Sequence, residues 1–381
     1  MGEKMKLFLS DAVRRVDPIL LICTTFLSLV SLVTVYGAVD NFGMSKLRMQ
    51  FAMTVAGVVL TFVVANLDYH VILDRLWAVM LIFSVGILGL TLVAGDTGAG
   101  VETANKSWLT IPGIGIAIQP SEFVKITFTC TFAKHLSSVR ATINQVRSIV
   151  GLGLHALLIV GLILVSGDLG VALVYIALTA IMLFGAGLSL WYFAGAIGAA
   201  VLAAPYLWSV LATHQQERII YGFRPDLDPL GAGMHAMTSK AAIASGGLFG
   251  RGMSGAVAYQ SMPTKGTYTD FIFAIFGEMF GFFACFLLIL IYAVMIIRTL
   301  HIARRHRKDM GSFICIGVAG VLLAQVLENI GMCLAMLPVV GITLPFMSYG
   351  GSSMLTNYAL LALVHSVHAN RNKYYFEREP S

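Results

Sequence analysis

The stretch PILLICTTFLSLVSLVTVYG, residues 18–37, is a run of 20 residues without a charged side chain. A helix of about 20 apolar residues spans the hydrocarbon core of a bilayer, and this run is too long for the core of a signal peptide. Across all 381 residues, 58% are hydrophobic and only 12% are charged, with a mean hydropathy of +0.84. Soluble globular proteins carry about 25% charged residues. The composition therefore indicates an integral membrane protein whose first span is retained.

The remaining spans follow from the apolar runs along the chain. These runs are continuous and do not alternate with the period of two that outer-membrane barrel strands show. Ten spans of about 20 residues would use roughly 200 residues, which excludes a large soluble catalytic domain. We predict an all-α polytopic protein, a single membrane domain over residues 1–381, with ten transmembrane helices. They lie at about 18–37, 49–66, 76–95, 119–135, 149–166, 170–186, 190–211, 271–297, 311–333 and 349–368.

The distribution of positive charge gives the orientation. With the N-terminus inside, 16 of the 25 Lys and Arg residues fall in segments on the cytoplasmic side. Cytoplasmic loops carry an excess of these residues, so we predict that both termini are cytoplasmic. The net charge of +6 reflects this bias, and we expect no nucleic-acid partner. The five cysteines lie in or at the ends of apolar runs without CxxC spacing, which is typical of buried small residues.

One long connection, about residues 212–269, lies on the outer side in this topology and is the fourth outer loop of the chain. Loops of this length are uncommon unless they are functional or disordered. The segment contains aromatic residues, regularly placed glycines and the helical pattern MHAMTSKAAIASGGLFGRG at 234–252. We therefore predict a structured long loop that folds against the outer mouth of the bundle.

Ionisable residues inside spans each cost at least about 2.5 kcal/mol and need a partner or a purpose. Glu122 and Lys125 are three residues apart on one helical face, so they either pair with each other or offer opposite charges to a cavity. Asp168 lies in the tight SGDLG connection, where capping of the next helix accounts for it as well as function does.

A second group of polar residues flanks the long loop. Asp270 opens the eighth span, and Glu278 follows about two turns later on roughly the same face. Gly277 and Gly281 form a GxxxG pattern around Glu278, which indicates a close helix approach and a buried acid. In the ninth span, the polar stripe of Gln325, Glu328 and Asn329 fits interhelical hydrogen bonding as well as substrate contact.

Four separated blocks make the sequence recognisable. They occur in one order over nearly the whole chain and together resemble the SEDS family, to which RodA, FtsW and their sporulation relatives belong. Gly167 and Tyr268 within these blocks, and Met279 directly after the third block, depart from the usual family residues. The blocks are WLTIPGIGIAIQPSEFVK at 108–125, SGDLG at 166–170, YTDFIFAIFGE at 268–278 and NIGMCLAMLPVVGITLPFMSYGGSS at 329–353.

The resemblance implies a peptidoglycan glycosyltransferase that polymerises lipid II at the outer face of the bacterial cytoplasmic membrane. It also implies a class B penicillin-binding protein as the cross-linking transpeptidase partner, within an elongation or division complex of membrane proteins. A divalent cation, magnesium or manganese, is expected as cofactor, with Asp270, Glu122 and Asp168 as candidate ligands.

The functional residues carry over by motif position. The essential acid of the fourth outer loop falls on Asp270, the paired charges on Glu122 and Lys125, and the acid of the tight connection on Asp168. The other substrate-binding candidates are Glu278 and, in the block that opens the last span, Ser348, Tyr349 and Ser352.

These residues fit the chemistry. Joining sugars from a lipid pyrophosphate needs a base for the acceptor hydroxyl and cationic help for the departing pyrophosphate. Our hypothesis makes Asp270 the general base on the 4-hydroxyl of GlcNAc, with inversion at the donor carbon to give a β-1,4 bond. Lys125, Arg218 and Lys240 are the candidates for pyrophosphate contact.

Two other classes of function fit part of the sequence. A lipid II flippase would use the intramembrane charges to carry substrate or protons, but alternating-access sites lie near the membrane midplane, whereas Asp270 is predicted at the outer face. A non-catalytic scaffold would not need Asp270. Within the family, the short termini and the PVVG turn at 338–341 favour an elongation member of the RodA type over a division or sporulation member.

Overall fold

The protein was analysed as a computed structural model, which describes residues 15–96, 107–110, 117–211, 213–228, 233–261, 267–305 and 310–370. It is helical, with a two-stranded antiparallel sheet that pairs Leu109 with Ile118 and Thr110 with Ala117. The elements are α2 (Pro18–Gly37), α3 (Val39–Phe42), α4 (Met44–Ala65), α5 (Tyr69–Ala94), β1 (Leu109–Thr110), β2 (Ala117–Ile118), α6 (Pro120–Val139), η1 (Arg140–Thr142), α7 (Val146–Val165), α8 (Leu169–Ala186), α9 (Leu190–Val210), α10 (Thr213–Phe223), η2 (Pro225–Leu227), α11 (Met234–Ser245), η3 (Ala258–Ser261), α12 (Ile272–Arg305), α13 (Met310–Cys333) and α14 (Gly351–Ala369).

Each of the ten predicted spans coincides with a helix. Among the described residues, seven of these helices are long and apolar enough to cross a membrane: α2, α4, α5, α7, α8, α12 and α13. The other three are α6, which carries Glu122, Lys125 and Lys134, α9, which contains Pro205, and α14, which carries polar and histidine side chains. The chain is therefore a multi-pass membrane protein of the predicted all-α class, and ten as the number of crossings stays a prediction.

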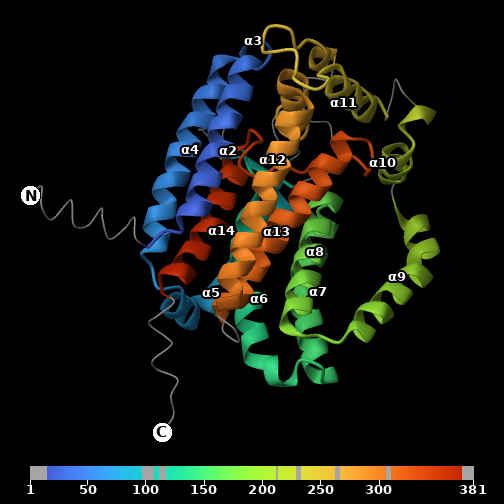
Figure 1. Cartoon of the computed structure of the whole chain (residues 1–381). Coiled ribbons are helices and arrows are strands. Elements are labelled where there is room, and N and C mark those ends of the chain that lie inside the picture. Colours follow the sequence, from blue (N-terminus) through green and yellow to red (C-terminus); the bar gives the residue numbers. More distant parts are fainter. Residues whose placement is uncertain are drawn as a thin grey trace, which may run out of the picture.

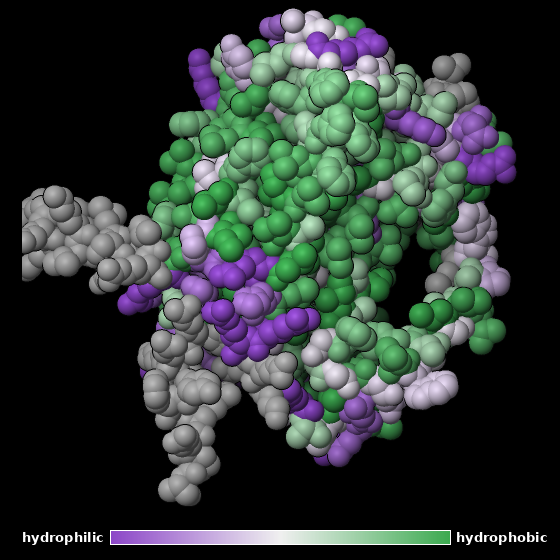
Figure 2. Space-filling model, in the orientation of Figure 1, coloured by the Kyte–Doolittle hydropathy of each residue, from purple (hydrophilic) through white to green (hydrophobic). Residues whose placement is uncertain are grey.

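Helix α13 is the centre of the bundle. Most of its residues are buried, and it packs against α6, α8, α12 and α14. In Figure 1 these helices form one bundle with α2 and α4 beside it, while α9 lies apart from the others. Figure 2 shows hydrophobic surface over the middle of the visible face and hydrophilic residues gathered toward its two ends, as a membrane-spanning bundle requires. All five cysteines are free thiols, and four of them are buried as predicted.

One end of the bundle is joined by a buried ion pair. Asp17 is fully buried, caps α2 by accepting from the Leu20 N–H, and accepts from Arg298 of α12 at 2.6 and 3.0 Å. Its own N–H donates to Nδ1 of His365 in α14. Burial opposes the charged form of Asp17, but its bonds to Arg298 and to the Leu20 N–H, together with the charges of Arg298 and His368, hold its pKa below the usual value. Arg298 therefore joins α12 to the start of α2.

The opposite end, which we call the loop end, carries the long loop. Within that loop α10 and α11 are the main helices, and α11 packs on α12 and α13. The hydroxyl of Ser239 on α11 donates to the carbonyl of Cys333 at the end of α13. The long loop is thus folded against the bundle, as predicted (Figure 1).

Helix α12 is broken at Gly281, whose φ of 78° and ψ of −174° are not helical. The backbone groups around the break pair with residues 247–252 of the long loop. Phe282 and Phe283 donate to Gly247 and Leu248, and the N–H groups of Arg251 and Gly252 donate to the carbonyls of Glu278 and Met279. The GxxxG pattern does mark a close approach, and its partner is the long loop instead of a spanning helix.

We expect Gly281→Ala to lower the thermal stability of the protein. A Cβ at this position would collide with the backbone of Leu248 to Gly250, and its positive φ is unfavourable for any residue with a side chain. Gly86→Ala in α5 is the matched control, because nothing lies within 4 Å of a Cβ there. Thermal unfolding of both purified variants in detergent tests this, and equal midpoints would contradict the role given to the break.

Candidate functional site

Two buried charges open α6 at the loop end. Lys125 Nζ lies 2.7 Å from Glu122 Oε1, and the two residues are only 1% and 4% exposed. The i, i+3 spacing places them on one face, and the structure shows the ion pair that the sequence left as one of two alternatives. The second carboxylate oxygen, Oε2, has no hydrogen-bond partner among the described residues.

Asp168 lies beside this pair, at the start of α8. Its Oδ1 accepts from the Val171 N–H at 3.1 Å, the capping interaction expected from the SGDLG turn. Its Oδ2 accepts from Gln119 Nε2 at 3.1 Å, which ties the start of α8 to the start of α6. Burial raises the pKa of Asp168 above its usual value, against the lowering effect of these two hydrogen bonds. Sequence reasoning missed Gln119, although its place directly before the PSE motif was a signal.

Asp270 lies in the turn that leads into α12 and is partly exposed. Its backbone carbonyl accepts from Asn329 Nδ2 of α13 at 2.7 Å. On one side the ring of the next residue, Phe271, stacks on His235 of α11 at 5.6 Å. On the other side the carboxylate lies against Gly341, where an added Cβ would be 3.4 Å from Oδ2. Asp270 is therefore anchored through its backbone carbonyl, and its carboxylate lies next to the segment before α14.

The segment 334–350 links the two acidic positions. A Cβ on Gly170, two residues after Asp168, would collide with Val340, and Gly341 follows beside Asp270. The fully buried side-chain amide of Asn329 donates to Ile342 O as well as to Asp270 O. It therefore connects the segment 334–350 to the turn before α12. Of the polar stripe in the ninth span, Asn329 thus hydrogen-bonds the backbone of two non-helical segments instead of another helix.

The non-helical segment is held by side chains from spanning helices. Tyr292 of α12 donates to Pro345 O, Ser31 of α2 to Met347 O, and Gln50 of α4 to Ser348 O. Phe346 has a positive φ of 62°, uncommon for a bulky residue, and its ring packs edge-on against Tyr358 at 5.2 Å. Sequence reasoning missed Ser31 and Gln50, because their partners are about 300 residues away.

The three predicted residues of the last block have different surroundings. Ser348 is 3% exposed, and its Oγ accepts from the Leu344 N–H at 2.7 Å. The Tyr349 N–H donates to Tyr268 O, and the two rings pack at 5.4 Å. Ser352 is partly exposed in the first turn of α14. Of these three residues, Tyr349 is therefore the one shown to contact the segment that carries Asp270.

The three other candidates lie on α10, α11 and α12. Lys240 is exposed on α11. Arg218 lies on α10, but its side chain is outside the described part of the structure. Glu278 is fully buried, and its carboxylate accepts three backbone N–H bonds from residues 257–259. Substrate binding by these residues stays a prediction.

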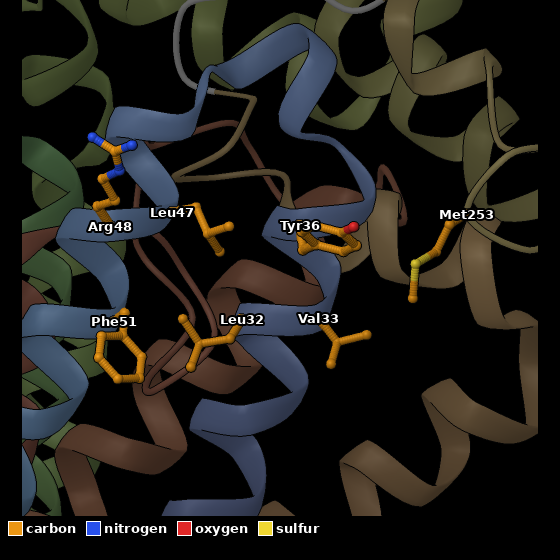
Figure 3. A pocket seen from close by; sticks show the side chains of 7 residues that line it. All are labelled: Leu32, Val33, Tyr36, Leu47, Arg48, Phe51 and Met253. Atoms are coloured by element: carbon orange, nitrogen blue, oxygen red, sulfur yellow. The ribbon is translucent and has the colours of Figure 1, made fainter.

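An apolar groove of about 520 Å³ lies between α2 and α4. Its walls are Leu32, Val33 and Tyr36 on α2 and Leu47 and Phe51 on α4, and Met253 of the long loop borders it (Figure 3). Arg48 is the one charged residue among those that line it. The neighbouring Lys46 lies 3.4 Å from the ring centroid of Tyr268, which places the groove close to the segment that carries Asp270.

The candidate metal ligands do not form a ready ligand set. Within the described ranges, no three His, Cys, Asp or Glu side chains come together in a way that could hold a metal ion. Glu122 uses Oε1 for Lys125, and Asp168 uses both oxygens for Val171 and Gln119. The binding of a divalent cation at this site therefore stays a prediction.

The fold and the site define a helical multi-pass membrane protein. At its loop end it has the buried Glu122 and Lys125 pair and the partly exposed Asp270, whose backbone is anchored by Asn329. The family model of FtsW, RodA and SpoVE, described as cell cycle protein, matches residues 14–373. The chain belongs to this family. Stage V sporulation protein E of Bacillus subtilis is 34% identical over 360 residues, 89% of this chain and 93% of the relative. Peptidoglycan glycosyltransferase MrdB of Escherichia coli is 34% identical over 361 residues, 93% of this chain and 94% of the relative.

Solved structures are similar over the same length. A chain from a peptidoglycan synthase complex, described for its structural coordination of polymerization and crosslinking, aligns with a TM-score of 0.81 at 27% identity. The alignment covers 93% of this chain and 98% of that chain. The rod shape determining protein RodA of Thermus thermophilus aligns with a TM-score of 0.69 at 26% identity, covering 93% of this chain and 97% of that one. The fold expected from the family resemblance is confirmed.

The Glu122 and Lys125 pair should behave as a buried unit. Glu122→Gln is expected to lower the free energy of unfolding by about 3–5 kcal/mol, because it leaves an uncompensated buried ammonium. The double variant Glu122→Gln with Lys125→Met should recover most of that loss. Unfolding in a denaturing detergent measures the cycle, and a double variant as unstable as the sum of both single variants would refute the coupling.

Proposed function

We propose that this chain is a peptidoglycan glycosyltransferase that polymerises lipid II into β-1,4 glycan strands. The observation that carries the proposal is the placement of Asp270. Its backbone is fixed by Asn329, its carboxylate lies against Gly341, and it is partly exposed at the end of a membrane-embedded bundle. The family and the relatives named peptidoglycan glycosyltransferase support the same activity.

In this proposal Asp270 is the general base. Its carboxylate takes the proton from the 4-hydroxyl of the acceptor GlcNAc as that oxygen attacks the anomeric carbon of the donor. The bond between that carbon and the pyrophosphate breaks on the opposite face, which inverts the configuration and gives the β-1,4 link. The proton ends on Asp270, and the electron pair leaves with the lipid pyrophosphate. Anchoring of the Asp270 backbone limits the motion of the base.

The departing pyrophosphate needs positive charge near it. Lys125 is paired with Glu122 but lies at the same end of the bundle, and Lys240 is exposed on α11. Both remain candidates, together with Arg218. A magnesium or manganese ion would neutralise the pyrophosphate charge. Mg²⁺ is commonly held by one or two carboxylates plus substrate phosphates, so the substrate itself would supply ligands that the described residues do not preassemble.

The orientation and partners follow from the same proposal. The loop end faces the outside of the bacterial cytoplasmic membrane, and both termini face the cytoplasm, as the Lys and Arg distribution predicts. A class B penicillin-binding protein is the proposed transpeptidase partner, because the structurally similar chain belongs to a complex that coordinates polymerization and crosslinking. An elongation complex of the RodA type is the proposed setting, with division and sporulation members as the alternatives.

The groove between α2 and α4 fits the lipid part of the substrate. Its walls are apolar, and Arg48 could contact a phosphate. We expect Leu47→Trp to raise KM for lipid II with its full polyprenyl chain and to leave KM for a short-chain analogue unchanged. Leu90→Trp, at an exposed position of α5, is the matched control. Equal effects of Leu47→Trp on both substrates would remove the groove from the proposal.

Asp270→Asn and Asp270→Ala should abolish polymerisation while the protein keeps its fold. The assay is gel analysis of glycan strands made by purified protein from lipid II and magnesium or manganese, with and without EDTA and a class B partner. A ladder that is lost in both variants supports the base assignment, whereas full activity of Asp270→Ala would refute it. No ladder under any condition, with measurable lipid II translocation in liposomes, would favour the flippase.

A further inference from the structure

Glu278 lies inside the protein and is fully buried on α12. Its Oε1 accepts from the N–H groups of Val257 and Ala258 at 2.8 and 2.7 Å, and its Oε2 accepts from the Tyr259 N–H at 2.8 Å. Three consecutive backbone N–H groups of the long loop thus converge on one carboxylate. Hydrogen bonds to an ionised acceptor are the strong ones, so this is a firm attachment of the loop to the helix.

The same turn of α12 is attached a second time. The carbonyls of Glu278 and Met279 accept from Arg251 and Gly252, and the break at Gly281 lets Phe282 donate to Gly247. The loop is therefore fastened on both sides of Glu278, through its side chain and through its backbone.

The attachment continues to the segment that carries Asp270. The Tyr259 ring packs against Phe42 of α3 at 6.3 Å, and Phe42 packs edge-on against Tyr268 at 5.4 Å. Tyr268 is two residues before Asp270, and its carbonyl accepts from the Tyr349 N–H. We call the three hydrogen bonds from residues 257–259 to the Glu278 carboxylate the clamp. An aromatic row, Tyr259, Phe42 and Tyr268, thus connects the clamp to the segment before the proposed base.

We propose that Glu278 is a positioning residue, which fixes the Tyr259, Phe42 and Tyr268 row and through it the location of Asp270. In this proposal it acts through the loop, because its side chain is buried and both its oxygens accept hydrogen bonds from loop amides. The inference rests on the proposed function for its kinetic consequence. The clamp itself is a statement about the fold and has its own test.

Glu278→Gln keeps the size of the side chain but removes its charge and turns one acceptor into a donor that faces another N–H group. We expect kcat for lipid II polymerisation to fall by about 10- to 100-fold, because a displacement of about 1 Å in a catalytic group has such an effect. KM should stay within about twofold of the wild type, since no substrate contact is lost. Glu217→Gln, an exposed carboxylate on α10 of the same loop, is the control and should match the wild type.

Hydrogen exchange followed by mass spectrometry, on full-length protein in detergent, measures the protection of the loop amides that bind Glu278. This measurement does not require polymerisation activity. In Glu278→Gln the amides of residues 257–259 should exchange faster, and those of residues 267–271 should follow. A raised KM with unchanged kcat would make Glu278 a substrate ligand and overturn the proposal. Unchanged exchange at residues 267–271, whatever the activity, would also overturn it.

A second variant keeps the proposal testable where Glu278→Gln does not fold. Phe42→Leu interrupts the aromatic row and leaves the carboxylate and its three amides in place. We expect lower kcat and faster exchange at residues 267–271, with residues 257–259 still protected. Wild-type kcat in Phe42→Leu would refute the connection. If the wild-type protein made no glycan, the proposed function would fail, while exchange would still decide whether the clamp exists.

Discussion

The site depends on one physical constraint: backbone that is not helical must be hydrogen-bonded by protein wherever a bilayer supplies no water. The chain meets this constraint twice near Asp270. At the Gly281 break, residues 247–252 of the long loop supply the partners of α12. In the segment 334–350, side chains of four spanning helices, Ser31, Gln50, Tyr292 and Asn329, donate to its carbonyls. Both solutions bring irregular chain, and therefore polar groups, to the same end of the bundle.

This arrangement explains why the acids of the site have different roles. Glu122 and Asp168 lie at helix starts, where Lys125, Gln119 and a backbone amide occupy most of their oxygens. Glu278 is fully occupied by loop amides. Asp270 differs because its backbone is fixed while it remains partly exposed. An acid with an anchored backbone and partial exposure suits a general base, whereas the carboxylates with occupied oxygens suit the framework around it.

The elements were largely predictable because their signals are local. Each predicted span became a helix, because apolar runs and caps such as Asp168 are local signals, although α5 begins seven residues before its predicted span and α12 ends eight residues after its own. The i, i+3 spacing of Glu122 and Lys125 placed them on one face and left an ion pair as one of two alternatives, which the structure then showed. Gly277 and Gly281 correctly indicated close packing, but the pattern does not say what packs there, and the partner proved to be the long loop.

The sequence by itself determined the membrane class, the helices, the candidate base and the family. Hydropathy, periodicity and the order of motifs are all properties of the linear sequence. The tertiary structure decided which polar groups meet. The bonds from Gln50 to Ser348 and from Asn329 to Asp270, and the three loop amides on Glu278, join residues 19 to 298 positions apart. Such pairings depend on how the helices pack around α13, and no local pattern encodes that packing.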